Sequence, residues 1–368
     1  MRKILSVLMV ALLALSLAAC SSPAASPAPA VTEAPAATEA PAAATQAPAA
    51  TEAPAASAAT DIPTTINGHQ IVVGIAHYST ADQGAALYAT VAKNYCDQNG
   101  WKYVFFDANN DAEQQAKDFQ DLINMKVDVI LTVPCDSAAI SDSVIAANEA
   151  GIPVVMMDRS SEEGKFLCLV QSDNEAHGYE SGVAMHKAAE VQGVKELKVV
   201  ELLGDMATSA GQERHNGFTR AAKEFGFNVV QSLAADWDSD KGYAAVMDGF
   251  TAHPDANALF LPSDNCYASS ALSALDQLKL LKKVGESGHI IITCVDGGSA
   301  ALDGIRNDTI DATASQQVSY MPVAALEYFA KYAKGELDAT AGQIVALKPI
   351  VATKDNVDSK DLWANNLG

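Results

Sequence analysis

The sequence has few basic residues and none of the short motifs that mark common catalytic sites. Lys and Arg number 24 against 45 Asp and Glu, so the formal net charge is −21. No basic cluster follows the N-terminal MRK, which argues against nucleic acid as a partner, because phosphate backbones are bound through clustered basic side chains. No G-x-S-x-G, G-x-G-x-x-G, Walker or H-E-x-x-H sequence occurs. We therefore expect neither an enzyme nor a cofactor.

Cysteine is also scarce. Apart from Cys20, the chain has five widely separated cysteines and no C-x-x-C, which predicts neither a zinc site nor a disulfide framework. Because five is odd, at least one thiol stays unpaired within the chain. The stretch DWDSDKG (236–242) resembles the start of an EF-hand loop, but its glycine comes seventh instead of sixth and no glutamate follows at the twelfth position. We expect no metal site.

The first sixty residues lack a candidate for a folded domain. MRK, an apolar run at 4–19 and Cys20 have the layout of a secretory signal. The sequence LAAC (17–20) is similar to the bacterial lipobox, whose cysteine receives lipid. The apolar run is shorter than the ~20 residues of a membrane span, so a transmembrane helix is less favoured. We predict a signal peptide at 1–20, lipidation of Cys20 and a disordered Ala/Pro/Thr/Glu linker at 21–60.

The remaining ~300 residues are more than one core usually serves, so two lobes are expected. Strand-length apolar runs alternate with segments whose apolar residues recur at helical spacing. Strands that are apolar throughout are buried on both faces, and their alternation with helices predicts parallel sheets covered on both sides. The predicted fold class is α/β, with two doubly wound lobes. The predicted strands are IVVGIA, KYVFFD, VDVILTVP, GIPVVMMD, LKVVELLG, FNVVQSLAAD, ALFLPSD, HIIITCVDG, DATASQ and one tail strand, QIVALKPIVA.

Nearly every predicted strand ends at an acid, an amide or a hydroxyl, where the ligand crevice of an open parallel sheet lies. Helix capping is the simpler interpretation for Asp107, Asp136 and Asp173. Asp158 and Arg159 differ, because a cap needs no arginine. A carboxylate accepts from vicinal hydroxyls and a guanidinium donates to sugar oxygens. Trp237 adds a flat apolar face that suits a pyranose ring, although a core position also suits it.

An ordered series of motifs resembles the ribose- and galactose-type periplasmic sugar-binding proteins that feed ABC importers. The series covers about residues 70–350 and comprises MMDRSS, QSDNEAHG, TSAGQERHNGF, ADWDSDKG, AHPDANALF, TCVDGG and DATASQ. The resemblance implies the periplasmic binding protein type I fold, in which three hinge crossings join two similar α/β lobes that close on a monosaccharide. We expect an N-terminal lobe at 61–172 and 317–345, and a C-terminal lobe at 173–316 and 346–368.

The resemblance also implies site residues. Asp158 and Arg159 would bind sugar hydroxyls from the first lobe, and Arg214 would donate from the second. Trp237 takes the place of a stacking aromatic, and the remaining implied positions are Asp296 as the second-lobe carboxylate and Gln316 as the hinge amide.

The sequence departs from the family's ribose members in two places. Those members have an asparagine and paired phenylalanines after the first strand, where this chain has YSTADQGAALY. Asp82 can serve for the asparagine, and Tyr78 is a candidate for the missing ring. In the second lobe, Ser263 stands where the family has an asparagine.

The expected function is capture of a pentose or hexose by hinge closure and its delivery to ABC permease subunits. The protein is expected to be a monomer, anchored by lipid on the outer face of the cytoplasmic membrane. A sensor that presents its closed form to a membrane receptor is the alternative. The exported N-terminus excludes a transcription regulator, and the sequence leaves the sugar unnamed.

Overall fold

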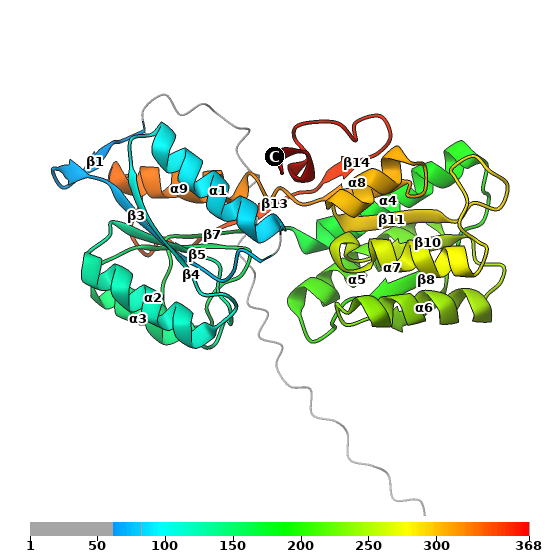
Figure 1. Cartoon of the computed structure of the whole chain (residues 1–368), viewed down its shortest axis with the longest axis horizontal. Helices are drawn as coiled ribbons and strands as arrows, with labels where there is room; N and C mark the ends of the chain where they lie inside the picture. The colour runs from blue at the N-terminus through cyan, green and yellow to red at the C-terminus, as the bar shows by residue number, and fades with distance from the viewer. Residues whose placement is uncertain (1–61, 82, 368) are drawn as a thin grey trace, which may run out of the picture. The chain divides into compact units, whose positions relative to one another are not determined.

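The computed structural model describes residues 62–81 and 83–367. The predicted signal peptide, Cys20, the linker and Asp82 lie outside the described residues. The described chain forms two α/β lobes, each built on a six-stranded sheet (Figure 1). This confirms the predicted fold class.

The sheet of the first lobe is parallel throughout, in the order β13-β7-β6-β5-β3-β4. Its strands are β3 (Val72–His77), β4 (Lys102–Asp107), β5 (Val129–Thr132), β6 (Val154–Met157), β7 (Cys168–Ser172) and β13 (Gln343–Leu347). Its helices are α1 (Gln83–Gln98), α2 (Ala112–Met125), α3 (Ser141–Glu149) and α9 (Met321–Ala333). A small hairpin, β1 (Thr65–Ile66) and β2 (His69–Gln70), precedes the sheet.

Helices cover both faces of this sheet, as the apolar strand sequences require. Along β5, Val129 and Leu131 join the hydrophobic cluster under α1 and α9, whereas Ile130 joins the cluster under α2 and α3. Successive side chains of a strand point to opposite faces, so a strand between two helical layers is apolar at every position. In Figure 1, α1 and α9 lie on one side of the sheet and α2 and α3 on the other.

The second lobe repeats this design, with the strand order β14-β12-β11-β10-β8-β9 and an antiparallel edge strand, β14. Its strands are β8 (Lys198–Leu203), β9 (Asn228–Ala234), β10 (Ala258–Leu261), β11 (Ile291–Asp296), β12 (Ala312–Ser315) and β14 (Ile350–Ala352). Its helices are α4 (Asn174–Gln192), α5 (Ser209–Phe225), α6 (Ser239–Ala252), α7 (Asp264–Gln277) and α8 (Ser299–Arg306), followed by a short 3-10 helix, η1 (Trp363–Asn366).

Two details of the strand prediction were wrong. The sequence reading missed β7, a five-residue strand that follows a polar loop and runs directly into the α4 cap. The tail QIVALKPIVA is two strands in two different sheets, β13 and β14, instead of one. Pro349 lies between them, and proline has no N–H to continue a strand ladder.

The chain passes between the two sheets three times within the described residues: after β7, after β12 and between β13 and β14. These passages agree with the three crossings that the family resemblance implies. The domain boundaries themselves stay a prediction, which the membership of β13 in the first sheet and β14 in the second supports.

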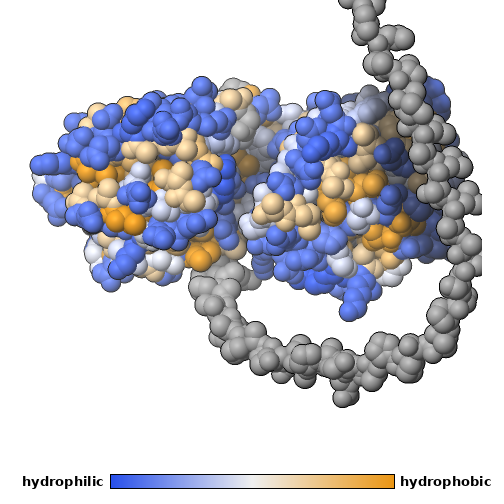
Figure 2. All heavy atoms as spheres, turned by 90° about the horizontal axis from the view of Figure 1, so that it is seen from below, coloured by the Kyte–Doolittle hydropathy of each residue, from blue (hydrophilic) through white to orange (hydrophobic). Residues whose placement is uncertain are grey.

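The surface that Figure 2 shows is mostly hydrophilic, with hydrophobic residues in small groups. Among the described residues, the large hydrophobic side chains that are well exposed are Met125, Val191 and Val284. None of the helices within the described ranges has the length and apolar character needed to cross a bilayer.

Candidate functional site

Three predicted site residues stand at strand ends in a backbone conformation that side chains rarely adopt. Asp158 follows β6 with φ 63°, Trp237 follows β9 with φ 58°, and Asp296 ends β11 with φ 108°. Positive φ in a non-glycine residue costs on the order of 1–3 kcal/mol and persists where surrounding contacts fix it. Such outliers at the carboxyl ends of parallel strands point to a functional site there.

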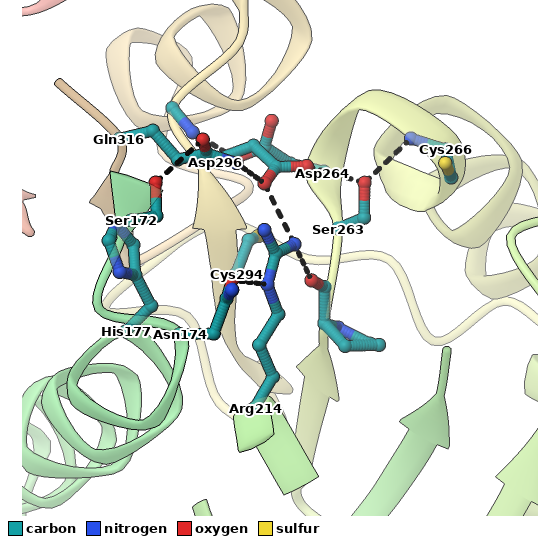
Figure 3. A network of polar contacts seen from close by, with 12 residues as sticks. Ser172, Asn174, His177, Arg214, Ser263, Asp264, Cys266, Cys294, Asp296 and Gln316 are labelled. Carbon is teal, nitrogen blue, oxygen red and sulfur yellow. Dashed lines mark hydrogen bonds and ion pairs between the residues drawn. The ribbon is translucent and has the colours of Figure 1, made fainter. Parts of the chain in front are cut away.

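Arg214 and Asp296 form the central ion pair of the second lobe. The Arg214 Nη1 lies 2.8 Å from Asp296 Oδ1, and the two side chains are 8% and 7% exposed. Removing a charge pair from water is costly unless further hydrogen bonds satisfy both partners. Figure 3 shows that both side chains have these further partners.

The Asp296 carboxylate accepts two more hydrogen bonds. Gln316 Nε2 donates to Oδ1 over 2.7 Å, and Ser263 Oγ donates to Oδ2 over 2.5 Å (Figure 3). An ionised carboxylate has about four lone-pair positions. Three of them are filled by described residues, so Oδ2 keeps one acceptor position for a ligand.

The Arg214 guanidinium donates hydrogen bonds to three residues and still has N–H groups without a partner among the described residues. Its Nε donates to Asn174 Oδ1 over 2.9 Å, and Nη1 donates to the Pro262 carbonyl over 2.7 Å as well as to Asp296. Helix α4 approaches closely because Gly178 has no side chain, and a Cβ there would lie 2.0 Å from the Arg214 carbonyl oxygen. Within the described residues, no hydrogen bond engages Nη2, whose two N–H groups remain for a ligand.

The polar network extends to the first lobe through Gln316, which lies just after β12. Its Oε1 accepts from Ser172 Oγ, at the end of β7, over 2.9 Å. One amide therefore connects the last residue of a first-lobe strand to the buried carboxylate of the second lobe (Figure 3).

A cavity of about 130 Å³ lies where these strand ends meet. Its lining combines two carboxylates and two amides with three aromatic rings and small apolar groups, and both lobes contribute. The lining residues are Tyr78, Gly84, Ala85, Tyr88, Asp158, Asn265, Asp296, Gln316, Val318 and Trp363.

Arg159 lies beside this cavity, in contact with residues that line it. Its guanidinium carbon is 5.0 Å from the centre of the Tyr78 ring, and its Nε is 3.4 Å from Asp158 Oδ2. The side chain is 43% exposed, so this ion pair is weak. Arg159 and Tyr78 stack as an arginine–aromatic pair next to the Asp158 carboxylate.

Trp237 is half-buried and lies against Arg214, whose guanidinium carbon is 5.7 Å from the ring centre. The indole also stacks on Tyr267 at 6.4 Å between ring centres. It is not among the residues that line the cavity. Its role as a stacking aromatic stays a prediction.

The structure thus brings four predicted residues to the cavity wall: Tyr78, Asp158, Asp296 and Gln316. The other predicted residues that the structure describes contact these four or the buried ion pair; they are Arg159, Arg214, Trp237 and Ser263. Ser263 also caps α7 by accepting a hydrogen bond from Cys266 N.

Sequence reasoning missed Tyr88 and Trp363 as cavity residues. Tyr88 lies on α1 beside the buried Leu87, and Trp363 comes from the C-terminal tail. Asn265 was not predicted as a site residue either; it is the second residue of α7, two positions after the Ser263 cap.

Two buried groups near the ion pair have shifted pKa values. Burial, followed by the positive charge of Arg214, lowers the pKa of His177 to about 4, so its ring is neutral near pH 7. Burial, followed by the charge of Asp296, raises the pKa of Asp264. His177 Nδ1 lies 2.7 Å from the Asp173 carbonyl oxygen, whereas its buried Nε2 has no hydrogen-bond partner among the described residues.

Other parts of the described chain offer no competing site of this chemistry. A larger cavity of about 530 Å³ lies on the second lobe between α4 and the segments around 308–312 and 351–355, and it contains none of the predicted site residues. In the described ranges, no group of three or more His, Cys, Asp or Glu could hold a metal ion, and the five described cysteines are free.

The chain belongs to the periplasmic binding protein family, whose domain model matches residues 73–337. It is 37% identical over 230 residues to the ribose import binding protein of Bacillus subtilis, a match that covers 62% of this chain and 71% of that one. It is 31% identical over 245 residues to the ribose import binding protein of Escherichia coli, covering 67% and 79% of the two chains. This membership makes the chain a binding protein rather than an enzyme.

Solved structures share the fold. A periplasmic solute-binding protein from Actinobacillus succinogenes with bound D-allose has a TM-score of 0.66 at 22% identity, and the match covers 78% of this chain and 99% of that one. At this identity the likeness concerns the fold alone.

Proposed function

We propose that this protein is the extracytoplasmic sugar-binding component of an ABC importer, which captures a monosaccharide between its lobes and delivers it to the permease. The observation that carries this proposal is the cavity, where two carboxylates and two amides from both lobes face three aromatic rings. The related proteins of Bacillus subtilis and Escherichia coli carry ribose import in their names, which supports an importer rather than a sensor.

The chemistry of the cavity suits a small polyol. Charged acceptors such as Asp158 and Asp296 bind hydroxyl donors with hydrogen bonds roughly twice as strong as neutral ones. The Nη2 donors of Arg214 complement sugar oxygens, and the aromatic rings complement the C–H face of a sugar. The volume of about 130 Å³ is far below the ~300–1,000 Å³ of sites for drug-sized ligands, so a single sugar ring is the expected size class.

Hinge closure supplies the mechanism. The ligand contacts groups from both lobes, and it therefore binds the closed arrangement more tightly and shifts the population toward it. Contacts between the lobes, such as Ser299 Oγ to Gln83 Oε1 at 3.3 Å, would add to the closed state. The proposed lobes are 61–172 with 317–345, and 173–316 with 346–368.

Calorimetry on protein that has been unfolded and refolded to remove bound ligand tests the proposal. Titration with D-ribose, D-allose, L-arabinose, D-galactose, xylitol and myo-inositol should identify at least one ligand with a Kd near micromolar, about 8 kcal/mol. Leucine and citrate serve as controls without a sugar ring. Binding of a control ligand alone would contradict the proposal.

Transport assays separate an importer from a receptor-coupled sensor. Deletion of the gene should abolish uptake of the ligand found by calorimetry, and complementation should restore it. Full uptake in the deletion strain would favour the sensor.

The N-terminal segment is proposed to tether the folded lobes to the outer face of the cytoplasmic membrane through a lipid on Cys20, with 21–60 as spacer. The sequence layout supports this. Cys20→Ser should release the protein into the soluble extracytoplasmic fraction and block incorporation of labelled fatty acid, whereas Cys135→Ser should leave both unchanged. The purified protein is proposed to be a monomer, which light scattering checks.

A further inference from the structure

Asp264 is a buried carboxylate that none of the sugar-site assignments uses. It is the first residue of α7 and is 1% exposed. The preceding residue, Ser263, caps this helix, so Asp264 is not needed as its N-cap. Its oxygens accept instead from a different segment, the turn that follows β11.

Three donors converge on the Asp264 carboxylate. Oδ2 accepts from Gly297 N over 2.8 Å and from Thr313 Oγ1 over 2.7 Å, and Oδ1 accepts from Gly298 N over 2.9 Å. The two backbone donors are the N–H groups directly after Asp296. The carboxylate therefore fixes the main chain where Asp296 adopts φ 108° and turns its side chain toward Arg214.

The same turn also contacts a second cavity residue. A Cβ on Gly298 would lie 2.0 Å from Asn265 Oδ1, so the turn packs directly against the Asn265 side chain. Asp264 thus holds one turn whose two sides position an acid and an amide of the cavity wall. Figure 3 shows Asp264 and Asp296 close together above the Arg214 guanidinium.

This arrangement places two carboxylates side by side in a buried region, where like charges repel. Burial and the charge of Asp296 both raise the pKa of Asp264, so the pair carries an electrostatic cost. The three hydrogen bonds to Asp264 offset that cost and hold the turn in a single conformation.

We propose that Asp264 is a positioning residue of the sugar site, whose buried carboxylate clamps the 296–298 turn and so sets the places of the Asp296 carboxylate and the Asn265 amide. The inference rests on the proposed function of this cavity. Asp264 acts through these two residues and does not line the cavity itself.

The variant Asp264→Asn tests the clamp. Asparagine has one oxygen, so its NH₂ group must face one of the backbone N–H groups and leave it unsatisfied. We expect the Kd for the sugar to rise at least about tenfold. Calorimetry and the thermal midpoint are measured together, because a purely structural role would lower Tm without changing the Kd of the folded fraction.

Asp311→Asn is the matched control. Asp311 is another aspartate of the second lobe whose side chain is only 4% exposed, and it accepts from Ile292 N over 2.8 Å. It lies at the N-terminal end of β12, away from the cavity lining. Its substitution should lower Tm and leave the Kd unchanged.

Thr313 gives a second, milder test in case Asp264→Asn fails to fold. Thr313→Val keeps the shape and removes one donor to Asp264, so the Kd should rise several-fold. Thr313→Ser keeps the hydroxyl and should stay near the wild-type Kd.

The outcomes separate this inference from the proposed function. If the wild-type protein binds no sugar, both are overturned. If the wild-type protein binds sugar and Asp264→Asn has the same Kd as Asp311→Asn, only the positioning role of Asp264 is overturned. If Asp264→Asn does not fold, equal Kd values for Thr313→Val and Thr313→Ser overturn that role instead.

Discussion

The indole Nε1–H of Trp363 donates to the main-chain oxygen of Asp296 over 2.8 Å. Trp363 is 2% exposed and packs within the hydrophobic cluster of the first lobe. The tail that carries it is tied to the second lobe, where Arg306 donates to Asp358 and Asn365. One side chain from the C-terminal tail therefore joins the main chain of Asp296, in the second lobe, to the first-lobe core at the wall of the cavity.

Trp363→Phe should weaken sugar binding beyond its effect on folding. The ring is kept, but the Asp296 carbonyl loses one of its two donors and retains only Gln316 N. We expect the free energy of unfolding to fall by about 1 kcal/mol and the Kd to rise several-fold. Urea denaturation and calorimetry measure the two effects.

Trp101→Phe is the control for this variant. Trp101 belongs to the same hydrophobic cluster and donates its indole N–H to the Pro63 carbonyl, away from the cavity. It should lose similar stability with no change in Kd. Equal Kd values for the two variants would show that Trp363 contributes to folding alone.

Arg214→Ala should abolish most of the binding. The substitution removes the Nη2 donors and leaves the Asp296 carboxylate buried without its counter-ion. Leaving a buried charge unpaired costs several kcal/mol, and we expect a loss of about 2–4 kcal/mol in sugar binding.

Arg220→Ala is matched to this variant, because Arg220 lies on the same helix, α5, and pairs with Glu175 at about half exposure. Exposed ion pairs contribute ~0–1 kcal/mol, so both its Kd and its stability should stay close to wild type. A sugar affinity of Arg214→Ala equal to that of Arg220→Ala would refute the assignment of the cavity.

The sequence predicted the two lobes because their central strands are apolar at every position. Val129, Ile130 and Leu131 each face a helical layer, and only a sheet covered on both sides buries all three. The split tail strand was not predictable in the same way. Short apolar runs lie on both sides of the Lys348–Pro349 pair, and which sheet each run joins depends on the path of the chain between the lobes.

The candidate site was predictable where a residue ends a strand. Asp158 follows the apolar strand β6 and Asp296 is the last residue of β11, and the carboxyl ends of parallel strands meet at one edge of each sheet. Trp363 gave no such signal, because its place at the cavity follows from tertiary contacts of the tail with both lobes. The hydrogen bonds of Asp264 could not be predicted either, because they too depend on tertiary contacts. The sequence indicates the start of a helix at Asp264 but not the turn that packs against it.

The pH dependence of stability should reflect the buried ring of His177. Burial and Arg214 lower its pKa from 6.5 to about 4. As pH falls below about 6.5, the unfolded chain takes up a proton at this ring and the folded chain does not, so the contribution of His177 to stability falls until pH 4. The loss is on the order of 3 kcal/mol. Urea denaturation between pH 4 and 7 measures it.

The acid limb is the fall in the free energy of unfolding between about pH 6.5 and pH 4. His177→Gln should make this fall shallower. His186→Gln, on the same helix with a partly exposed ring, should keep the wild-type slope of unfolding free energy against pH. The comparison uses the slopes, because either substitution changes absolute stability. An unchanged slope in His177→Gln would assign the acid limb to carboxylates.

Two other histidines affect the pH dependence of stability in the opposite direction to His177. The hydrogen bond that His215 donates to the Glu201 carboxylate raises the pKa of His215. For His289, burial lowers the pKa, but the hydrogen bond to Asp311, the charge of Asp311 and the hydrogen bond to the Lys282 carbonyl together raise it. Their stabilisation is complete below pH ~6.5 and is lost as pH rises through the raised values. These two histidines therefore contribute a loss of stability as pH rises above ~6.5, and His289→Gln should weaken that decline.

Trp237 is the predicted stacking aromatic that does not line the cavity, and its variants decide between two roles. If the ring contacts the sugar or holds Arg214 in place, Trp237→Ala should weaken binding by about 1–2 kcal/mol. Gly204→Ala tests the same role of the ring without replacing Trp237. A Cβ at position 204 would lie 2.0 Å from Trp237 Cη2 and would displace the indole.

Tyr179→Ala provides the comparison for both variants. The Tyr179 ring also lies against an arginine, with the Arg220 guanidinium carbon 4.1 Å from its centre, but it does not line the cavity, and its hydroxyl donates to Glu224. We expect Trp237→Ala and Gly204→Ala to raise the Kd while Tyr179→Ala does not. If all three bind sugar as the wild type does, Trp237 serves the packing of Tyr267 alone, and the aromatic face of the site comes from Tyr78, Tyr88 and Trp363.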